Sequence, residues 1–114
     1  MFVINTQRDL FKKDCIELLI LALLAESDKY GYDLVQEISQ RSEGTFSIKE
    51  GSMYPTLYRL EDRGYISSQK VQIGKRQTRV YYHLEETGRK YFQELKESYY
   101  NIHASVCRIL EYKS

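Results

Sequence analysis

The feature that most constrains the fold is a long amphipathic segment at the C-terminal end, residues 86–112. Its apolar side chains recur at spacings of 4, 4, 3, 4 and 3, at Tyr91, Leu95, Tyr99, Ile102, Val106 and Ile109. This near-heptad spacing predicts one helix whose apolar seam packs against another helix. Such a helix is about 40 Å long. That length exceeds the width of a compact domain of this size, whose radius of gyration is only about 13 Å. We therefore expect its far end to project and a second copy of the chain to cover the seam, as a homodimer.

Size and composition exclude several other classes of protein. The chain has 114 residues, of which 42% are hydrophobic and 29% are charged, as expected for one compact globular domain. Its longest apolar run, residues 18–25, is shorter than the ~20 residues that span a membrane. The N-terminus has no signal-peptide layout, and Cys15 and Cys107 are too far apart in sequence for a CxxC pair. We expect a cytoplasmic protein with no membrane partner.

The charges are distributed unevenly along the chain. The formal net charge is only +1, from 17 basic and 16 acidic residues. The segment between Arg63 and Leu84 contains no acidic residue and has a formal charge of +5, so the remainder of the chain sums to −4. Its basic residues are Arg63, Lys70, Lys75, Arg76 and Arg79. A solvated surface loop would also show such a run, so its meaning depends on the neighbouring elements.

Three helices and a hairpin are predicted before the long C-terminal helix. Residues 9–26 form a helix that is apolar nearly all round, which predicts contacts with the core and, through Leu18 and Ala22, with a second subunit. Residues 33–41 form the second helix. The third helix ends near residue 62 and begins either at Ser47, as a capping box with Glu50, or at Glu50 itself. Residues 65–72 and 78–84 form a hairpin with a basic tip.

This order of elements predicts a winged helix-turn-helix, a mainly α fold with a small β-hairpin (α+β). Residues 1–85 would form the winged-helix domain, and residues 86–114 would form a dimerisation helix that packs on the first helix. The major groove of B-DNA accepts one helix, and a basic hairpin beside it meets the phosphate backbone. The basic segment lies where such a wing needs it. We therefore expect double-stranded DNA as a partner.

Three sequence motifs also carry a family resemblance. The segment 51–66, GSMYPTLYRLEDRGYI, closely resembles the signature of PadR-type transcriptional regulators. The segment 30–34, YGYDL, resembles the start of that family's second helix, and Thr87-Gly88 matches the segment after the second strand of the hairpin. The resemblance covers nearly the whole chain. Its length is similar to that of the short family members, which have a single C-terminal helix.

The resemblance implies a homodimeric repressor whose third helix reads operator DNA and whose wing contacts the DNA backbone. The implied contacts on the third helix are Ser52, Tyr54, Pro55, Thr56 and Arg59, and those on the wing are Lys75, Arg76 and Arg79. Lys70 in the basic segment and Tyr30 at the start of the second helix complete the candidate DNA-binding set. Tyr54 has an alternative role, because it would also pack beneath its helix.

A small-molecule effector is a further expectation. Some short family members bind aromatic or cationic drugs between subunits through a tryptophan on the last helix, and this chain has no tryptophan. Within two turns of the last helix lie Tyr99, Tyr100, His103 and Cys107, which offer rings and polar groups to an aromatic or hydrophobic ligand. Ordinary packing at the interface between subunits is the alternative interpretation.

Catalytic, metal and cofactor roles find no support in the sequence. It contains no G-x-S-x-G motif, no phosphate-binding glycine loop and no histidine–carboxylate pair at a useful spacing. Neither His83 nor His103 has a second histidine or a carboxylate four residues later, so no metal site and no cofactor are expected. A winged helix that binds proteins instead of DNA is the remaining alternative, and the acid-free basic segment disfavours it.

Overall fold

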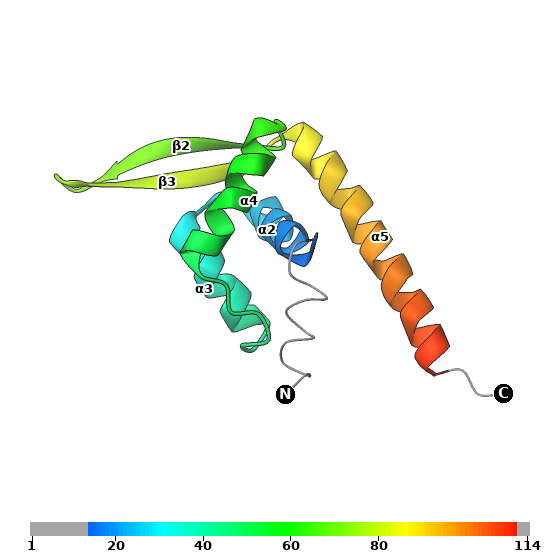
Figure 1. The fold of residues 1–114 in the computed structure, drawn as a ribbon. Coiled ribbons are helices and arrows are strands. Elements are labelled where there is room, and N and C mark those ends of the chain that lie inside the picture. The colour runs from blue at the N-terminus through cyan, green and yellow to red at the C-terminus, as the bar shows by residue number, and fades with distance from the viewer. Residues whose placement is uncertain (1–13, 112–114) are drawn as a thin grey trace.

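The computed structural model describes residues 14–111, which form four helices and one small sheet (Figure 1). The elements in chain order are α2 (Asp14–Glu26), β1 (Lys29–Tyr30), α3 (Gly31–Arg41), α4 (Glu50–Asp62), β2 (Ile66–Ile73), β3 (Gln77–Leu84) and α5 (Glu86–Leu110). The predicted winged-helix class is confirmed, with one strand more than expected. Residues 9–13 of the first predicted helix lie outside the described residues.

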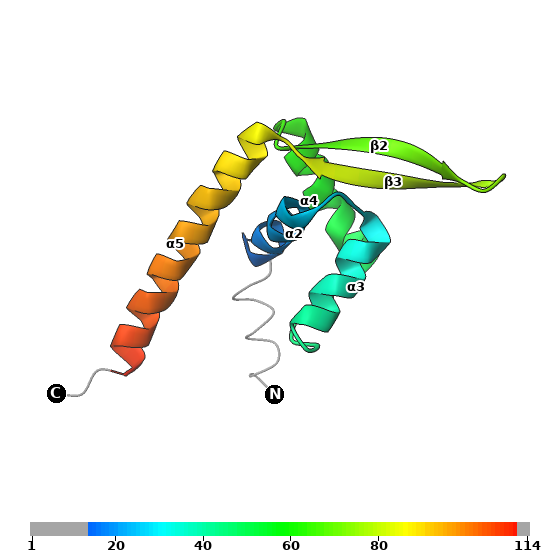
Figure 2. The same cartoon turned by 180° about the vertical axis from the view of Figure 1, so that it is seen from behind.

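The hydrophobic core is centred on α2, which lies between α4 and α5 and contacts both (Figure 2). Four of its side chains, Ile20, Leu21, Leu23 and Leu24, are at most 5% exposed. They pack with buried residues from every other helix and from the hairpin, namely Leu34, Ile38, Met53, Leu57, Leu60, Ile66, Tyr82, Leu84 and Phe92. Helix α2 is apolar nearly all round because other elements pack against it on several sides, as its sequence predicted.

The sheet has three antiparallel strands in the order β1-β3-β2. In the hairpin, β2 and β3 pair along their whole length, from Ile66 opposite Leu84 to Ile73 opposite Gln77. The short strand β1 adds Lys29 opposite Tyr82 and Tyr30 opposite Tyr81. The sequence analysis predicted no strand between the helices at residues 9–26 and 33–41. Two residues are too few for a period-2 pattern, so only the pairing with β3 defines β1 as a strand.

Two helices begin at residues other than those first expected. Helix α3 begins at Gly31 instead of Asp33, directly after β1. Helix α4 begins at Glu50 with Lys49 as its N-cap, and no side chain caps it in this described stretch. The capping box from Ser47 is therefore wrong, and the alternative start at Glu50 is confirmed. Pro55 lies inside α4, so the helix contains a residue that has no amide to donate.

The end of α4 is closed by Gly64. Its φ of +78° is in the left-handed region that glycine adopts at little cost. The Gly64 amide donates to the carbonyl of Glu61 at 3.0 Å, and the Tyr65 amide donates to the carbonyl of Leu60 at 3.0 Å. These two bonds form a Schellman motif, which turns the chain directly into β2. The helix end predicted near residue 62 is confirmed.

Helix α5 gives the molecule its elongated shape. It runs for 25 residues away from the winged helix (Figure 1), and the whole chain has extents of 66 × 34 × 21 Å. The radius of gyration is 16.2 Å, compared with about 13 Å for a compact chain of this length. The predicted projection is thus confirmed. Among the described helices, none is both long and apolar enough to cross a membrane.

Candidate nucleic-acid interface

Helix α4 presents a narrow polar surface on its outer side. The side chains of Met53, Leu57 and Leu60 are fully buried and fasten the inner side of the helix to the core. Ser52 and Pro55, two predicted DNA contacts near the start of the helix, are exposed. Thr56 is only 6% exposed. Its predicted place on the outer surface is wrong, because residue 56 lies on the same side of the helix as residues 53 and 60.

Tyr54 lies on the flank of α4 that faces the start of α3. Its hydroxyl donates a hydrogen bond of 3.2 Å to the Glu50 carboxylate, and burial followed by this bond raises the pKa of Tyr54. A Cβ atom built on Gly31 would lie 2.7 Å from the Tyr54 hydroxyl oxygen. The start of α3 and the side chain of Tyr54 on α4 are therefore in contact at residue 31, where glycine is the residue that fits without displacing Tyr54. Tyr54 is half-buried, so both predicted roles, packing and DNA contact, remain compatible with its place.

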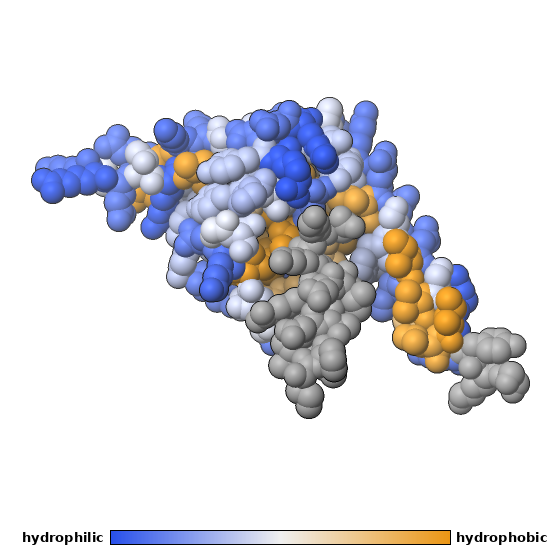
Figure 3. Space-filling model, viewed as in Figure 1, coloured by the Kyte–Doolittle hydropathy of each residue, from blue (hydrophilic) through white to orange (hydrophobic). Residues whose placement is uncertain are grey.

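The hairpin carries Lys75 and Arg76 at its tip, far from the core. Gly74 begins the turn with a φ of +69°, and both basic side chains are exposed. Figure 3 shows the tip as a hydrophilic projection at the end of the hairpin. Between Arg63 and Leu84 the segment has no carboxylate to offset these charges. The tip is thus a positive, solvated end well suited to phosphate groups.

Two residues from the turn end of β3, Arg79 is positioned by an aromatic ring. Its guanidinium lies 4.5 Å from the centroid of Tyr30, a cation–π contact. The Tyr30 ring also lies 5.7 Å from that of Tyr81. Tyr30 is therefore placed to hold Arg79. Lys70 on β2 is exposed and lies opposite Val80, so its side chain is on the other face of the hairpin from Arg79, which lies opposite Val71.

An open groove of about 640 Å³ lies between the hairpin and α4. It brings together four of the predicted residues, Tyr30, Tyr54, Lys70 and Arg79, and several that sequence reasoning did not select. The lining residues are Tyr30, Gly31, Tyr32, Glu50, Tyr54, Tyr58, Glu61, Ser68, Lys70, Thr78, Arg79, Val80 and Tyr82. Tyr58 on α4 is 59% exposed and stacks on Tyr54 with ring centroids 6.2 Å apart. Tyr32 is 46% exposed. Only the tertiary structure distinguishes these tyrosines from buried ones.

Arg59 differs from the other predicted contacts because, among the described residues, it forms an ion pair with a carboxylate. Its guanidinium lies 3.7 Å from the carboxylate of Glu17 on α2, and the Arg59 side chain is 45% exposed. Glu17 itself is only 7% exposed. The guanidinium is thus directed toward α2, and Arg59 is not among the residues that line the groove.

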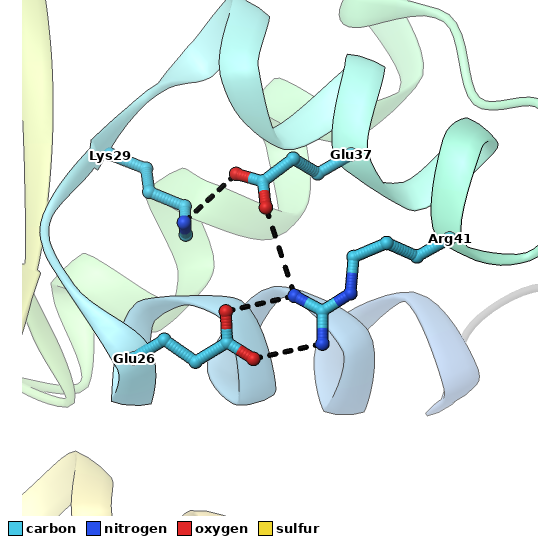
Figure 4. A network of polar contacts seen from close by, with 4 residues as sticks. All are labelled: Glu26, Lys29, Glu37 and Arg41. Atoms are coloured by element: carbon cyan, nitrogen blue, oxygen red, sulfur yellow. Dashed lines mark hydrogen bonds and ion pairs between the residues drawn. The ribbon is translucent and has the colours of Figure 1, made fainter.

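The position of α3 is secured by charged groups at the end of α2 (Figure 4). Arg41 donates two hydrogen bonds of 2.8 Å to the carboxylate of Glu26, and these bonds lower the pKa of Glu26. Lys29 lies 2.8 Å from Glu37, which is also 3.7 Å from Arg41. The network joins α2, β1 and α3, and it supports the helix on which Gly31 meets Tyr54.

Comparison with known proteins identifies the family of this arrangement. The family model described as "Transcriptional regulator PadR-like family" matches residues 20–94, which run from α2 to the first turns of α5. The chain belongs to the PadR-like family. Its members are transcriptional regulators, so the expectation from segment 51–66 is confirmed at the level of the family.

Individual PadR-like relatives are similar over the same region. A transcriptional regulator from Clostridium thermocellum has a solved structure that matches with a TM-score of 0.82 and 29% identity, over 90% of this chain and 99% of that chain. The transcriptional regulator YqjI of Escherichia coli is 30% identical over 82 residues, which are 72% of this chain and 38% of YqjI. Bacillus subtilis PadR in complex with operator DNA matches with a TM-score of 0.66 and 25% identity, over 70% of this chain and 45% of that chain.

In this PadR-like chain the predicted seam of α5 divides into two halves. Tyr91 and Leu95, like Leu18 and Ala22 on α2, are half-buried against the chain's own core. The distal half is open, with exposed fractions of 63% for Ile102, 46% for Val106 and 76% for Ile109. Figure 3 shows this distal half as a hydrophobic patch.

The four candidate effector residues lie on a neighbouring face of the same distal helix. The Tyr99 ring stacks on His103 with centroids 5.9 Å apart and meets Tyr100 edge-on at the same distance. The sulfur of Cys107 lies 3.6 Å from His103 Nε2. Tyr99 and Tyr100 are 36% and 61% exposed. Their rings are thus already clustered on an accessible surface.

Proposed function

We propose that this PadR-like chain is a cytoplasmic, homodimeric, sequence-specific DNA-binding repressor that a small molecule releases from its operator. The observation that carries the proposal is the pairing of an exposed, acid-free basic wing tip with the exposed outer side of α4. In other winged helices these two elements meet the phosphate backbone and the major groove. The similarity to the solved complex of Bacillus subtilis PadR with operator DNA supports the same use here.

Each part of the interface has a separate role in this proposal. Ser52, Pro55 and Tyr58 face the bases from the outer side of α4, and Tyr54 meets DNA from the groove. Lys75 and Arg76 neutralise backbone phosphates at the tip of the wing, while Lys70 and Arg79 do so along its strands. Phosphate contacts add affinity for every DNA sequence, whereas contacts from α4 discriminate between base pairs.

The homodimer is supported by the open half of the α5 seam. Three seam residues between 46% and 76% exposed, together with Leu110 at 77%, form an apolar surface on a projecting helix. A second α5 would cover this surface with near-heptad packing. Two copies would also present two recognition helices, as an operator with two half-sites requires.

The effector part of the proposal rests on the cluster of Tyr99, Tyr100, His103 and Cys107. In the dimer these rings would border the contact between the two α5 helices. A planar aromatic ligand stacked among them would alter the packing of the helices and with it the spacing of the recognition helices. A panel of planar aromatic compounds, screened for release of labelled operator, tests this part, and release should be lost in a Tyr99→Ala variant that still binds DNA.

The DNA-binding proposal is tested by electrophoretic shift with the DNA upstream of the protein's own gene. We expect a complex whose affinity falls linearly with salt on a logarithmic scale. The Lys75→Gln/Arg76→Gln variant should weaken binding to all DNA and reduce the salt slope by about two. The matched control is Arg89→Gln/Lys90→Gln, which removes two exposed charges from α5 and should bind normally. Absence of any complex at low salt would contradict the proposal and favour a protein-binding winged helix.

A further inference from the structure

Glu17 is a buried carboxylate that joins three helices. It lies on α2, the helix at the centre of the hydrophobic core, and is only 7% exposed. One of its oxygens accepts a hydrogen bond from the Tyr91 hydroxyl of α5, and the other lies 3.7 Å from the guanidinium of Arg59 on α4. A carboxylate at such a depth is costly unless polar partners surround it. No function described so far requires one at this place.

The start of α5 is attached to the end of α4 at a second point. The Glu85 amide donates to the Tyr65 carbonyl at 2.9 Å, and the Thr87 hydroxyl donates to the Gly64 carbonyl at 2.7 Å. Gly88 approaches the Tyr65 carbonyl so closely that a Cβ atom would collide with it. This contact acts as a pivot, since it fixes where α5 begins but leaves its direction to contacts further along.

Tyr91 is the polar contact that contributes to this direction, beside Phe92 and Leu95, which pack on the core. It lies about one turn beyond Gly88, its ring stacks on Tyr65 with centroids 4.3 Å apart, and its hydroxyl reaches Glu17. Burial and then the bond to Glu17 raise the pKa of Tyr91 to about 12, so its hydroxyl remains a donor at physiological pH. Through Glu17 this position of α5 is coupled to Arg59 on α4.

We infer that Glu17 is a positioning residue that sets the angle between the recognition helix and α5, and that Arg59 acts through Glu17 and not by contacting DNA. The inference rests on the proposed dimer, in which the two α5 helices pack against each other about the twofold axis. The angle between α4 and α5 within one copy then determines the separation of the two recognition helices. A change at α5 would reach the DNA-binding surface by this route.

The salt dependence of operator binding separates this role from a direct phosphate contact. We expect Arg59→Met and Glu17→Gln each to weaken operator binding about tenfold with an unchanged salt slope. The double variant should bind about as well as either single variant, because both changes break one connection. Glu97→Gln, an exposed carboxylate on α5, is the matched control and should bind normally. A salt slope that falls by about one in Arg59→Met, with multiplicative losses in the double variant, would overturn the inference.

A measurement without DNA makes the inference independent of operator binding. Spin labels are attached at Ser52→Cys and Ser98→Cys in a Cys15→Ser/Cys107→Ser background, which removes the two native cysteines. The distance between the labels reports the separation of α4 and α5. Dilution with unlabelled protein leaves one labelled copy in each dimer. Glu17→Gln and the milder Tyr91→Phe should broaden the distance distribution alike, and an unchanged distribution in both would overturn the inference. If the wild type binds no DNA but the distributions broaden, the proposed function fails while the positioning role of Glu17 stands.

Discussion

Gly31 and Tyr54 are in contact at the point where the two helices of the helix-turn-helix meet. A Cβ atom at residue 31 would lie 2.7 Å from the hydroxyl oxygen of Tyr54 and 3.3 Å from two of its ring carbons. The atom in the way is the far end of a side chain, so the tyrosine, and not the backbone, would have to move. The identity of residue 31 therefore determines the position of a tyrosine on the proposed DNA-binding surface.

Gly31→Ala should alter DNA binding without unfolding the protein. Alanine favours a helix over glycine by about 0.5–1 kcal/mol, which offsets the cost of displacing the Tyr54 ring, so we expect the unfolding free energy to change by less than about 1 kcal/mol. Operator affinity should fall about tenfold in a titration. Adding Tyr54→Phe removes the colliding oxygen and should restore part of the loss. Wild-type affinity in Gly31→Ala would show that the position of Tyr54 is irrelevant to DNA binding.

Gly88→Ala should be severe, because its obstacle is the backbone carbonyl of Tyr65. The new methyl group forces α5 away from the end of α4, and overpacking of this kind costs about 2–4 kcal/mol. Urea denaturation measures the loss. The matched control is Gly51→Ala, another helical glycine, at which a Cβ atom meets nothing within 4 Å among the described residues. It should stabilise the protein by about 0.5–1 kcal/mol, and an equal effect at both positions would contradict this prediction.

Charges in the open seam of α5 should separate the two copies of the chain. Ile102→Glu with Val106→Glu places two carboxylates on the surface that a second α5 would cover, so sedimentation should report a monomer where the wild type is a dimer. Circular dichroism should still show a folded protein, because neither side chain is buried within one copy. Ala104→Glu, on the opposite side of the same helix, is the control and should remain dimeric. An unchanged dimer in the double variant would move the interface elsewhere.

The protein should lose stability in strong alkali, where the Tyr82 hydroxyl ionises. Burial raises the pKa of Tyr82 to about 12, above its ordinary value near 10. Because the folded state holds the proton more tightly, the stabilisation is complete below pH 10 and is lost as the pH rises toward 12. For a side chain only 3% exposed, this amounts to about 2–3 kcal/mol. Urea denaturation between pH 9 and 12 measures it.

Tyr82→Phe is the control for the alkaline loss. It should make the decline of unfolding free energy above pH 10 less steep, leaving the decline that Tyr91 contributes, because the pKa of Tyr91 is also raised to about 12. If the decline is as steep in Tyr82→Phe as in the wild type, other groups are responsible for the alkaline unfolding.

Local features of the sequence predicted most of the helices and strands. In the candidate site they predicted the wing tip and the recognition helix. The spacing of apolar residues in segment 86–110, Gly64 after α4 and the basic turn at residues 74–76 depend on neighbours within a few residues. Their helix, helix end and wing tip were therefore readable without the fold. The family signature at residues 51–66 identified the recognition helix on the same local basis.

Other features depended on contacts between segments far apart in the sequence. The strand β1 exists only because two residues pair with β3, and Thr56 is buried only because the core covers that side of α4. Tyr58 looks like Tyr54 in sequence, yet it is 59% exposed.

The sequence alone determined which segments become helices, where the positive charge accumulates and that α5 must project. The tertiary structure decided how the side chains of those segments are used. Arg59 is directed to Glu17, 42 positions earlier, and Glu17 in turn meets Tyr91, 74 positions later. The physical reason is that helical spacing and turn geometry arise from adjacent residues, whereas burial and charge pairing arise from whichever elements the packed core brings together.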